Sequence, residues 1–350
     1  MSSRPAVRRD GGAVLLRSGA GSNTSSFQTS RMLDQNVVVH GELIEVEPWE
    51  VDRWCRNHLG SGIDEELFRY GHLSAVIGIR LISGPQVVVK VRRTSGRLVA
   101  CADAHHVLFE RGFPCPEPLV DLEPFGEGKG VASAEKMIVG GDPFPNSGRS
   151  PAPFAEALAH LVALAPKSEE LDTLDPAPPW TSPSNGTDLW PWPDDRDIDL
   201  NEVNGPAWID ESGWAARDRL QISGGPPIIG HGDWYTANLR WAGDGLLAAF
   251  DWDSVIAAPE PVIVGLAAAL YPATYAGTEA SIDETQEFLD AYMSARARGF
   301  SDEELEEAWA AGLWNRSFDA KKQFSTEGKV ESLTEGESLE RQRRAGVGRV

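Results

Sequence analysis

The most informative part of this sequence is HGDWYTAN at residues 231–238, which is followed by FDWD at residues 250–253. Short apolar runs flank both motifs, and this pattern predicts a strand leading into each of them. Asp233 and Asn238 stand at the two ends of a loop that can curl back, and Asp251 directly follows the strand-like run 246–250. We therefore expect three oxygen-bearing side chains from two segments to meet at one point.

These side-chain types match the chemistry of phosphoryl transfer. The reaction requires a carboxylate that orients the attacking hydroxyl and accepts its proton, and oxygen ligands for the magnesium ions that bridge the ATP phosphates. Asp233 suits the first role, while Asn238 and Asp251 supply the hard oxygen ligands that Mg²⁺ prefers. A capped turn or a strand end would explain either motif alone, whereas both motifs in this order favour a metal–phosphate site.

The pattern Asp-x4-Asn followed by a strand-borne Asp resembles the catalytic loop and the metal-binding Asp of the kinase superfamily. The HGD and DWD forms are similar to those of the aminoglycoside phosphotransferases, choline kinases and related small-molecule kinases. The resemblance implies that Asp233 is the catalytic base and that Asn238 and Asp251 hold magnesium. It also implies that His231 supports the loop by hydrogen bonding, that ATP or GTP is the donor, and that the acceptor is a small-molecule hydroxyl.

Lys90 is the second informative residue, because it interrupts the apolar run VVVKV at residues 87–91. An unpaired ammonium is costly to bury, so an anionic group should meet it unless it faces solvent from an edge strand. In the kinase pattern the equivalent Lys binds the α and β phosphates. The usual Glu partner on the next helix would fall near Cys101, and a thiol cannot take that role. Asp103 is the nearest acid, either as a shorter substitute or as a solvated helix residue.

The nucleotide loop gives a weaker signal. The stretch GHLSAVIG at residues 71–78 lies where a phosphate-covering loop belongs, yet it lacks the GxGxxG pattern. Ser74 and nearby backbone amides are predicted to approach the phosphates, although an ordinary turn explains the stretch equally well. By resemblance, residues 135–138 form the lobe connector whose backbone meets adenine.

The order of elements predicts a small sheet-based lobe followed by a mostly helical region, and the family resemblance implies an α+β, bilobal protein-kinase-like fold. A small antiparallel sheet is expected in an N-lobe at residues 46–139, followed by a mostly helical C-lobe at 140–318. Helices are predicted at 47–59, 98–111, 154–164, 262–270, 282–296 and 302–314, and strands at 73–81, 86–91, 131–139 and in two runs within 228–250. The Pro- and Trp-rich stretch 168–199 should cross irregularly. Residues 1–45 are expected to be a disordered tail. Residues 319–350 are expected to be a charged tail, with a frayed helix from Lys321 as the alternative.

Composition narrows the classes of partner. The net charge of -21 argues against nucleic acid, whose phosphates require a basic surface, and is compatible with a cationic acceptor or simply with solubility. No apolar stretch approaches the ~20 residues needed to cross a bilayer. The three scattered cysteines form no disulfide framework, so a cytoplasmic location is expected.

Two other classes of function remain open from the sequence. Loss of the helix Glu is compatible with an ATP-binding pseudokinase that acts as a regulatory or interaction module. A metal-dependent hydrolase could be built on His231, Asp233 and Asp251, but it would require further His or carboxylate ligands at metal spacing.

Overall fold

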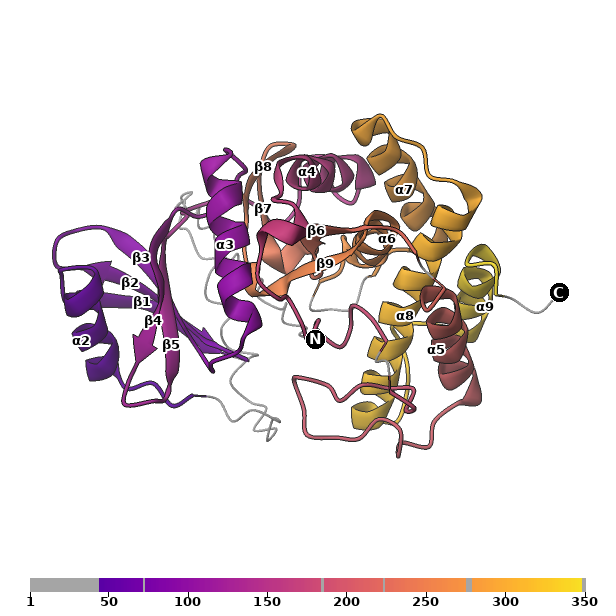
Figure 1. Cartoon of the computed structure of the whole chain (residues 1–350), viewed down its shortest axis with the longest axis horizontal. Helices are drawn as coiled ribbons and strands as arrows, with labels where there is room; N and C mark the ends of the chain where they lie inside the picture. Colours follow the sequence, from indigo (N-terminus) through magenta and orange to yellow (C-terminus); the bar gives the residue numbers. More distant parts are fainter. Residues whose placement is uncertain (1–43, 72, 184–185, 223, 275–278, 348–350) are drawn as a thin grey trace, which may run out of the picture. The chain divides into compact units, whose positions relative to one another are not determined.

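The computed structural model describes residues 44–71, 73–183, 186–222, 224–274 and 279–347 (Figure 1). Within these ranges the first elements form an antiparallel sheet with the strand order β1-β2-β3-β5-β4. Its strands are β1 (Ile63–Gly71), β2 (Ala75–Leu81), β3 (Gln86–Arg92), β4 (Pro118–Phe125) and β5 (Gly130–Lys136). Two helices, α2 (Pro48–His58) and α3 (Arg97–Glu110), complete this sheet lobe.

The alternation of side chains in β3 explains how the sheet is used. Val87, Val89 and Val91 are buried in one core with Val51 and Trp54 of α2. Because successive side chains point to opposite faces of a strand, Lys90 and its neighbours at two-residue spacing face away from α2. Figure 1 shows α3 on that other side of the sheet, toward the remaining helices.

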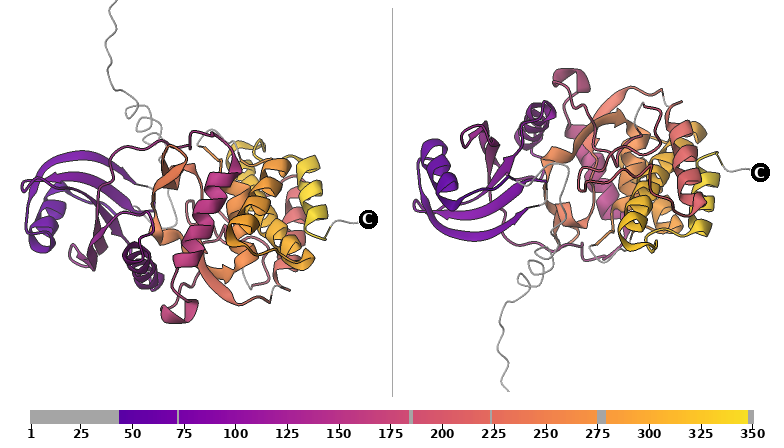
Figure 2. Two further views of the ribbon diagram at one scale, coloured as in Figure 1. Left: turned by 90° about the horizontal axis from the view of Figure 1, so that it is seen from above. Right: turned by 90° about the horizontal axis from the view of Figure 1, so that it is seen from below.

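The second group of elements, here called the helical lobe, contains α4 to α9 and two short two-stranded ladders (Figure 2). Its helices are α4 (Pro151–Leu164), α5 (Ala207–Leu220), α6 (Glu260–Leu270), α7 (Ile282–Arg296), α8 (Asp302–Glu327) and α9 (Glu335–Arg344). The ladders pair β6 (Pro227–His231) with β9 (Val255–Pro259), and β7 (Leu239–Ala242) with β8 (Gly245–Ala249). Three 3-10 turns complete the set: η1 (Ser168–Glu170), η2 (Thr236–Asn238) and η3 (Trp252–Ser254).

A close crossing of α6 and α8 organises the helical lobe. Every residue of α6 from Pro261 to Leu270 is buried. At Gly265 a Cβ atom would lie 1.9 Å from the backbone oxygen of Ala308, so only glycine permits this approach. None of the helices in the described ranges is long and apolar enough to span a membrane.

The predicted α+β kinase-like fold is confirmed, and most of its elements appear where they were expected. The strand β9 and one of the three strands β6, β7 and β8 were missed. Also missed were β1 and β4, which are the two edges of the sheet, and α5. Their mixed polar sequences give little periodicity because they are only partly buried. The helical region also continues past Phe318, since α8 runs to Glu327 and α9 follows it, where a charged tail was expected. Of the predicted N-terminal tail, residues 1–43 lie outside the described ranges.

Candidate active site

His231 connects the two loops that carry the sequence motifs. It ends β6, whose pairing with β9 places it opposite Val255. Its Nδ1 accepts a hydrogen bond from the Asp233 backbone N–H at 3.2 Å, so Nε2 carries the proton and donates to the Phe250 carbonyl oxygen at 3.0 Å. Burial lowers the pKa of His231 and keeps the ring neutral. Both ring nitrogens are therefore occupied in supporting the loops.

Asn238 and Asp233 form the centre of the site. The Asn238 side-chain amide donates to Asp233 Oδ2 at 2.8 Å and to the Asp233 carbonyl oxygen at 2.9 Å. The Phe250 N–H in turn donates to the Asn238 carbonyl oxygen at 2.8 Å, which ties the two loops together. Burial, together with the negative charge of Asp251, raises the pKa of Asp233 to about 7. An electrostatic effect of this kind means that the two carboxylates lie close to each other.

Asp251 has an unusual backbone. Its φ of 61° and ψ of 55° lie in the left-handed region, which residues other than glycine seldom adopt. The turn is stabilised by Ser254, whose N–H donates to the Asp251 carbonyl oxygen at 3.0 Å and whose hydroxyl donates to Asp251 Oδ2 at 3.3 Å. Strained backbone held in this way is common where a side chain must be aimed at a site.

The donor set fits a magnesium ion. No described residue donates a hydrogen bond to Oδ1 of Asn238 or to Oδ1 of Asp251, so a hard oxygen atom of each side chain is available as a ligand. In the described ranges no cluster of three or more His, Cys, Asp or Glu side chains could hold a metal. A site of this kind is completed by phosphate oxygens and water rather than by the protein alone. His231 has both ring nitrogens engaged in hydrogen bonds, so it offers no free nitrogen to the metal that the hydrolase alternative requires.

Lys90 is paired within the sheet. Its Nζ lies 3.5 Å from Oε1 of Glu135 on β5, and both side chains are buried. Burial lowers the pKa of Lys90, but the carboxylates of Glu135, Asp251 and Asp253 together raise it above its ordinary value. The expectation that an anionic group meets this lysine is therefore confirmed. The suggested partner was wrong, because Asp103 is exposed on α3.

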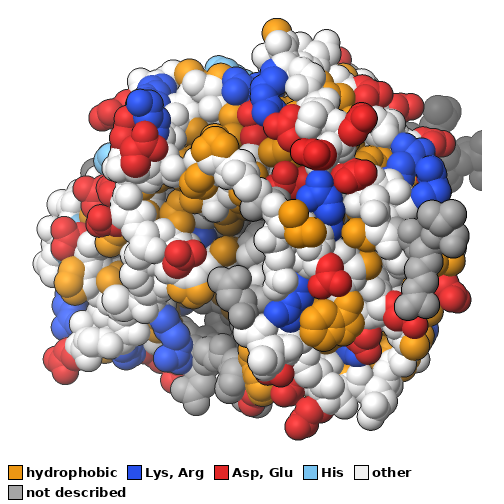
Figure 3. Space-filling model, turned by 45° about the vertical axis from the view of Figure 1, so that its right-hand side comes forward, with side chains coloured by type: hydrophobic (Ala, Val, Ile, Leu, Met, Phe, Trp, Pro, Cys, Tyr) orange, Lys and Arg blue, Asp and Glu red, His pale blue; other side chains and the backbone are white. Residues whose placement is uncertain are grey.

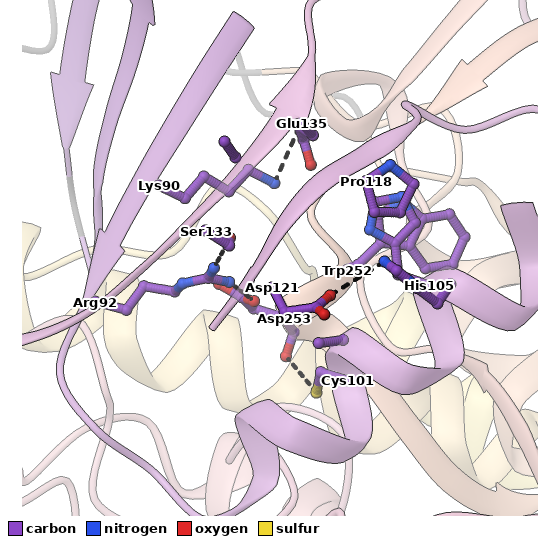
Figure 4. Close-up of a pocket in the computed structure, with 13 residues that line it drawn as sticks. Lys90, Arg92, Cys101, His105, Pro118, Asp121, Ser133, Glu135, Trp252 and Asp253 are labelled. Carbon is purple, nitrogen blue, oxygen red and sulfur yellow. Dashed lines mark hydrogen bonds and ion pairs between the residues drawn. The ribbon is translucent and has the colours of Figure 1, made fainter. Parts of the chain in front are cut away.

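Ser74, which was predicted to approach the nucleotide phosphates, lies half-buried immediately before β2. A separate cavity of about 40 Å³ lies beside Lys90, between the sheet and α3 (Figure 4). This volume has room for a few water molecules.

A scan against protein-family models matches residues 80–300 to the phosphotransferase enzyme family, APH. The chain belongs to this phosphotransferase family. The fold is similar to that of the amicoumacin kinase hAmiN in complex with AMP-PNP, Ca²⁺ and Ami, with a TM-score of 0.58 and 11% identity over 87% of this chain and 93% of that one. Spectinomycin phosphotransferase APH(9)-Ia in complex with ADP and spectinomycin gives a TM-score of 0.53 and 11% identity over 86% and 94% of the two chains.

The Plasmodium vivax ethanolamine kinase gives a TM-score of 0.50 and 11% identity over 86% of this chain and 83% of that one. A search of curated proteins finds no match. The resemblance inferred from the HGD and DWD motifs is thus confirmed at the level of the family, and the distant structures agree in fold.

Within this phosphotransferase, sequence reasoning missed three residues around the DWD loop. Glu135 was assigned to the lobe connector 135–138, whereas it lies in β5 and its side chain pairs with Lys90. Arg92 and Arg97 were not recognised, and both contact Asp253. A signal was present for Arg92, since it follows Lys90 at two-residue spacing in an apolar strand and shares its face.

Proposed function

We propose that this chain is an ATP- and Mg²⁺-dependent phosphotransferase that moves the γ-phosphate to a hydroxyl group of a small molecule. The observation that carries the proposal is the hydrogen bond from Asn238 to Asp233, close to the negative charge of Asp251, which helps to raise the pKa of Asp233. Family membership supports it. The similar kinase structures hold AMP-PNP with Ca²⁺ or ADP, which supports a nucleotide donor.

The side chains suit distinct tasks in this reaction. Asp233 would orient the acceptor hydroxyl and take its proton, and a pKa of about 7 is well matched to a base working near neutral pH. Asn238 and Asp251 would hold Mg²⁺, which when bound neutralises charge on the phosphates. Lys90, kept charged by its surroundings, would bind the nucleotide phosphates. Ser74, immediately before β2, would cover them.

We also propose a cationic acceptor, because further acids act on the catalytic carboxylate. The charges of Asp319 and Asp194 both raise the pKa of Asp233, so both lie on its side of the helical lobe. Asp195 is paired with Arg196 and Lys322. By contrast, neither Asp194 nor Asp319 forms a salt bridge with any described residue. An ammonium group on the acceptor would supply the missing positive charge.

We also propose that nucleic acid is neither the acceptor nor a partner. On the face shown in Figure 3, Lys and Arg side chains are scattered among Asp and Glu, and no broad basic patch is visible. A net charge of -21 disfavours association with phosphate backbones, which require a positive surface.

The test is a phosphate-transfer screen of the purified protein with ATP and GTP as donors. Hydroxylated amines would be compared with neutral sugars of similar size, and transfer would be followed by the mass of the product. Asp233→Asn should abolish transfer while leaving ATP binding intact. Retained transfer in this variant would contradict the assigned base. Tight ATP binding without transfer to any acceptor would favour the pseudokinase alternative, which the Lys90–Glu135 pair now makes less attractive.

A further inference from the structure

The DWD loop is anchored to the sheet lobe through its second aspartate. The carboxylate of Asp253 pairs with the guanidinium of Arg92 on β3. Its backbone oxygen accepts a hydrogen bond from Arg97 Nη1 at 2.6 Å, and the Cys101 thiol lies 3.7 Å from the same oxygen. Figure 4 shows Arg92 extending from its strand to Asp253, with Cys101 approaching from α3. Both the side chain and the backbone oxygen of Asp253 are thus engaged in contacts with other residues of the protein.

Arg92 is itself held firmly in the sheet. Its second amino group donates to the hydroxyl of Ser133 on β5, which lies opposite Lys90 in the strand register. The side chain is buried, so its charge has little access to water. A buried arginine with one carboxylate partner fixes the position of that partner, because separation would leave two charges uncompensated.

The two ion pairs on this face of the sheet therefore connect different parts of the protein. The pair of Lys90 and Glu135 joins β3 to β5 and stays within the sheet. The pair of Arg92 and Asp253 leaves the sheet and reaches the loop that carries Asp251. Asp103, the acid suggested on α3, is exposed, and two sheet residues form the ion pairs instead: Glu135 with Lys90, and Arg92 with Asp253.

The contact at Asp253 constrains the position of Asp251, because the backbone between the two residues has little conformational freedom. Asp251 is fixed in a left-handed conformation, and the turn closes through the Ser254 N–H. The carbonyl of Ser254 then accepts a hydrogen bond from the Gly232 N–H at 2.8 Å, next to Asp233. A shift of Asp253 would thus be passed to the proposed magnesium ligand and to the catalytic loop.

We propose that Arg92 is a positioning residue for magnesium: through Asp253 it sets the place of Asp251, whereas Glu135 positions Lys90 alone. The proposal rests on the proposed function. It assigns the second acid of the DWD motif to anchoring the loop rather than to binding the metal. Removing groups that orient metal ligands typically weakens metal binding about 10- to 100-fold.

The experiment measures ADP binding by calorimetry over a series of Mg²⁺ concentrations, so no acceptor is needed. Arg92→Gln and Asp253→Asn should each raise the Mg²⁺ concentration that gives half of the Mg²⁺-dependent gain in ADP affinity by about tenfold or more. Affinity for ADP in EDTA should change less than about threefold. The double variant should show no further increase, since both changes break one contact. Arg92→Lys should recover part of the loss.

Glu135→Gln is the matched control, from the other ion pair on the same face. It should weaken ADP binding in EDTA while leaving the half-saturating Mg²⁺ concentration unchanged. An unchanged Mg²⁺ requirement in Asp253→Asn, or equal losses of ADP and Mg²⁺ binding, would overturn the proposal even if Arg92→Gln did not fold. Failure of the unaltered protein to bind ADP with Mg²⁺ would instead refute the proposed function.

Discussion

Glu135 on β5 lies 3.5 Å from Lys90 on the adjacent strand, and both side chains are buried on the face of the sheet opposite α2. The ammonium is thus neutralised from within the sheet before any nucleotide arrives. Since neighbouring strands are rigidly hydrogen-bonded, this arrangement fixes Lys90 without help from the position of α3.

Removing this carboxylate should destabilise the protein. Glu135→Ala leaves a buried ammonium without its nearest partner, and such a change costs about 3 kcal/mol of unfolding free energy. Asp103→Ala, at the exposed α3 position, should change the value by less than about 0.5 kcal/mol. Urea denaturation of both variants tests the prediction. Equal effects at the two sites would mean that the ion pair has no stabilising role.

The environment of Asp194 predicts a pH dependence. Burial raises its pKa to about 6, opposed by Lys322 and reinforced by Asp195. Asp319, whose own pKa burial also raises, lies in the same group of charges. The folded protein therefore binds an extra proton between about pH 4 and 6, and its stability should fall as pH rises through this window and level off above it. Ionised Asp194 attracts a cation, so KM for an amine acceptor should fall as pH rises through 6.

The Asp194→Asn variant tests separately the effect of Asp194 on stability and its effect on KM. At pH 8 the variant should be more stable than the unaltered protein by about 1–2 kcal/mol, and at pH 4 the difference should vanish. Its KM for a hydroxylated amine should lose the inflection near pH 6, while KM for a neutral acceptor should not respond to the substitution. An identical pH profile of KM in both proteins would show that Asp194 does not contact the acceptor.

How much the sequence predicts depends on the range of the interaction. The motifs around Asp233 and Asp251 could be recognised because each lies within a short stretch, and the kinase-like fold followed from the family resemblance that these motifs carry. The partner of Lys90 could not be recognised in this way, because Glu135 lies on the neighbouring strand β5, which is far from β3 in the sequence. Arg92 and Asp253 are separated still further, and no local pattern marks a contact of that kind.

The helix crossing at Gly265 was equally invisible in the sequence, and it gives a third prediction. Gly265→Ala would place a methyl group 1.9 Å from the Ala308 oxygen, so α6 and α8 must move apart. Overpacking of this kind costs about 1–3 kcal/mol or more. Gly336→Ala is the control on α9, where nothing lies within 4 Å of the added carbon. It should stabilise the protein by up to about 1 kcal/mol, because alanine favours helix. Thermal unfolding of the two variants should shift in opposite directions.

The last prediction concerns the charged C-terminal stretch, which contains an arginine that is buried in the folded protein. Arg341 on α9 is 0% exposed and donates to the Ala280 carbonyl oxygen at 2.6 Å and to Glu337 at 2.9 Å. Arg341→Ala would leave both acceptors without this donor and open a void, which should cost about 3–5 kcal/mol of unfolding free energy.

Arg343 is the matched control two residues along the same helix. Its side chain is 66% exposed and pairs with Glu340, so Arg343→Ala should cost less than about 1 kcal/mol. Urea denaturation of both variants measures the difference. If the two arginines proved equally dispensable, α9 would not be an integral part of the helical lobe, and the end of the folded region would lie nearer to Phe318, as its charge pattern first indicated.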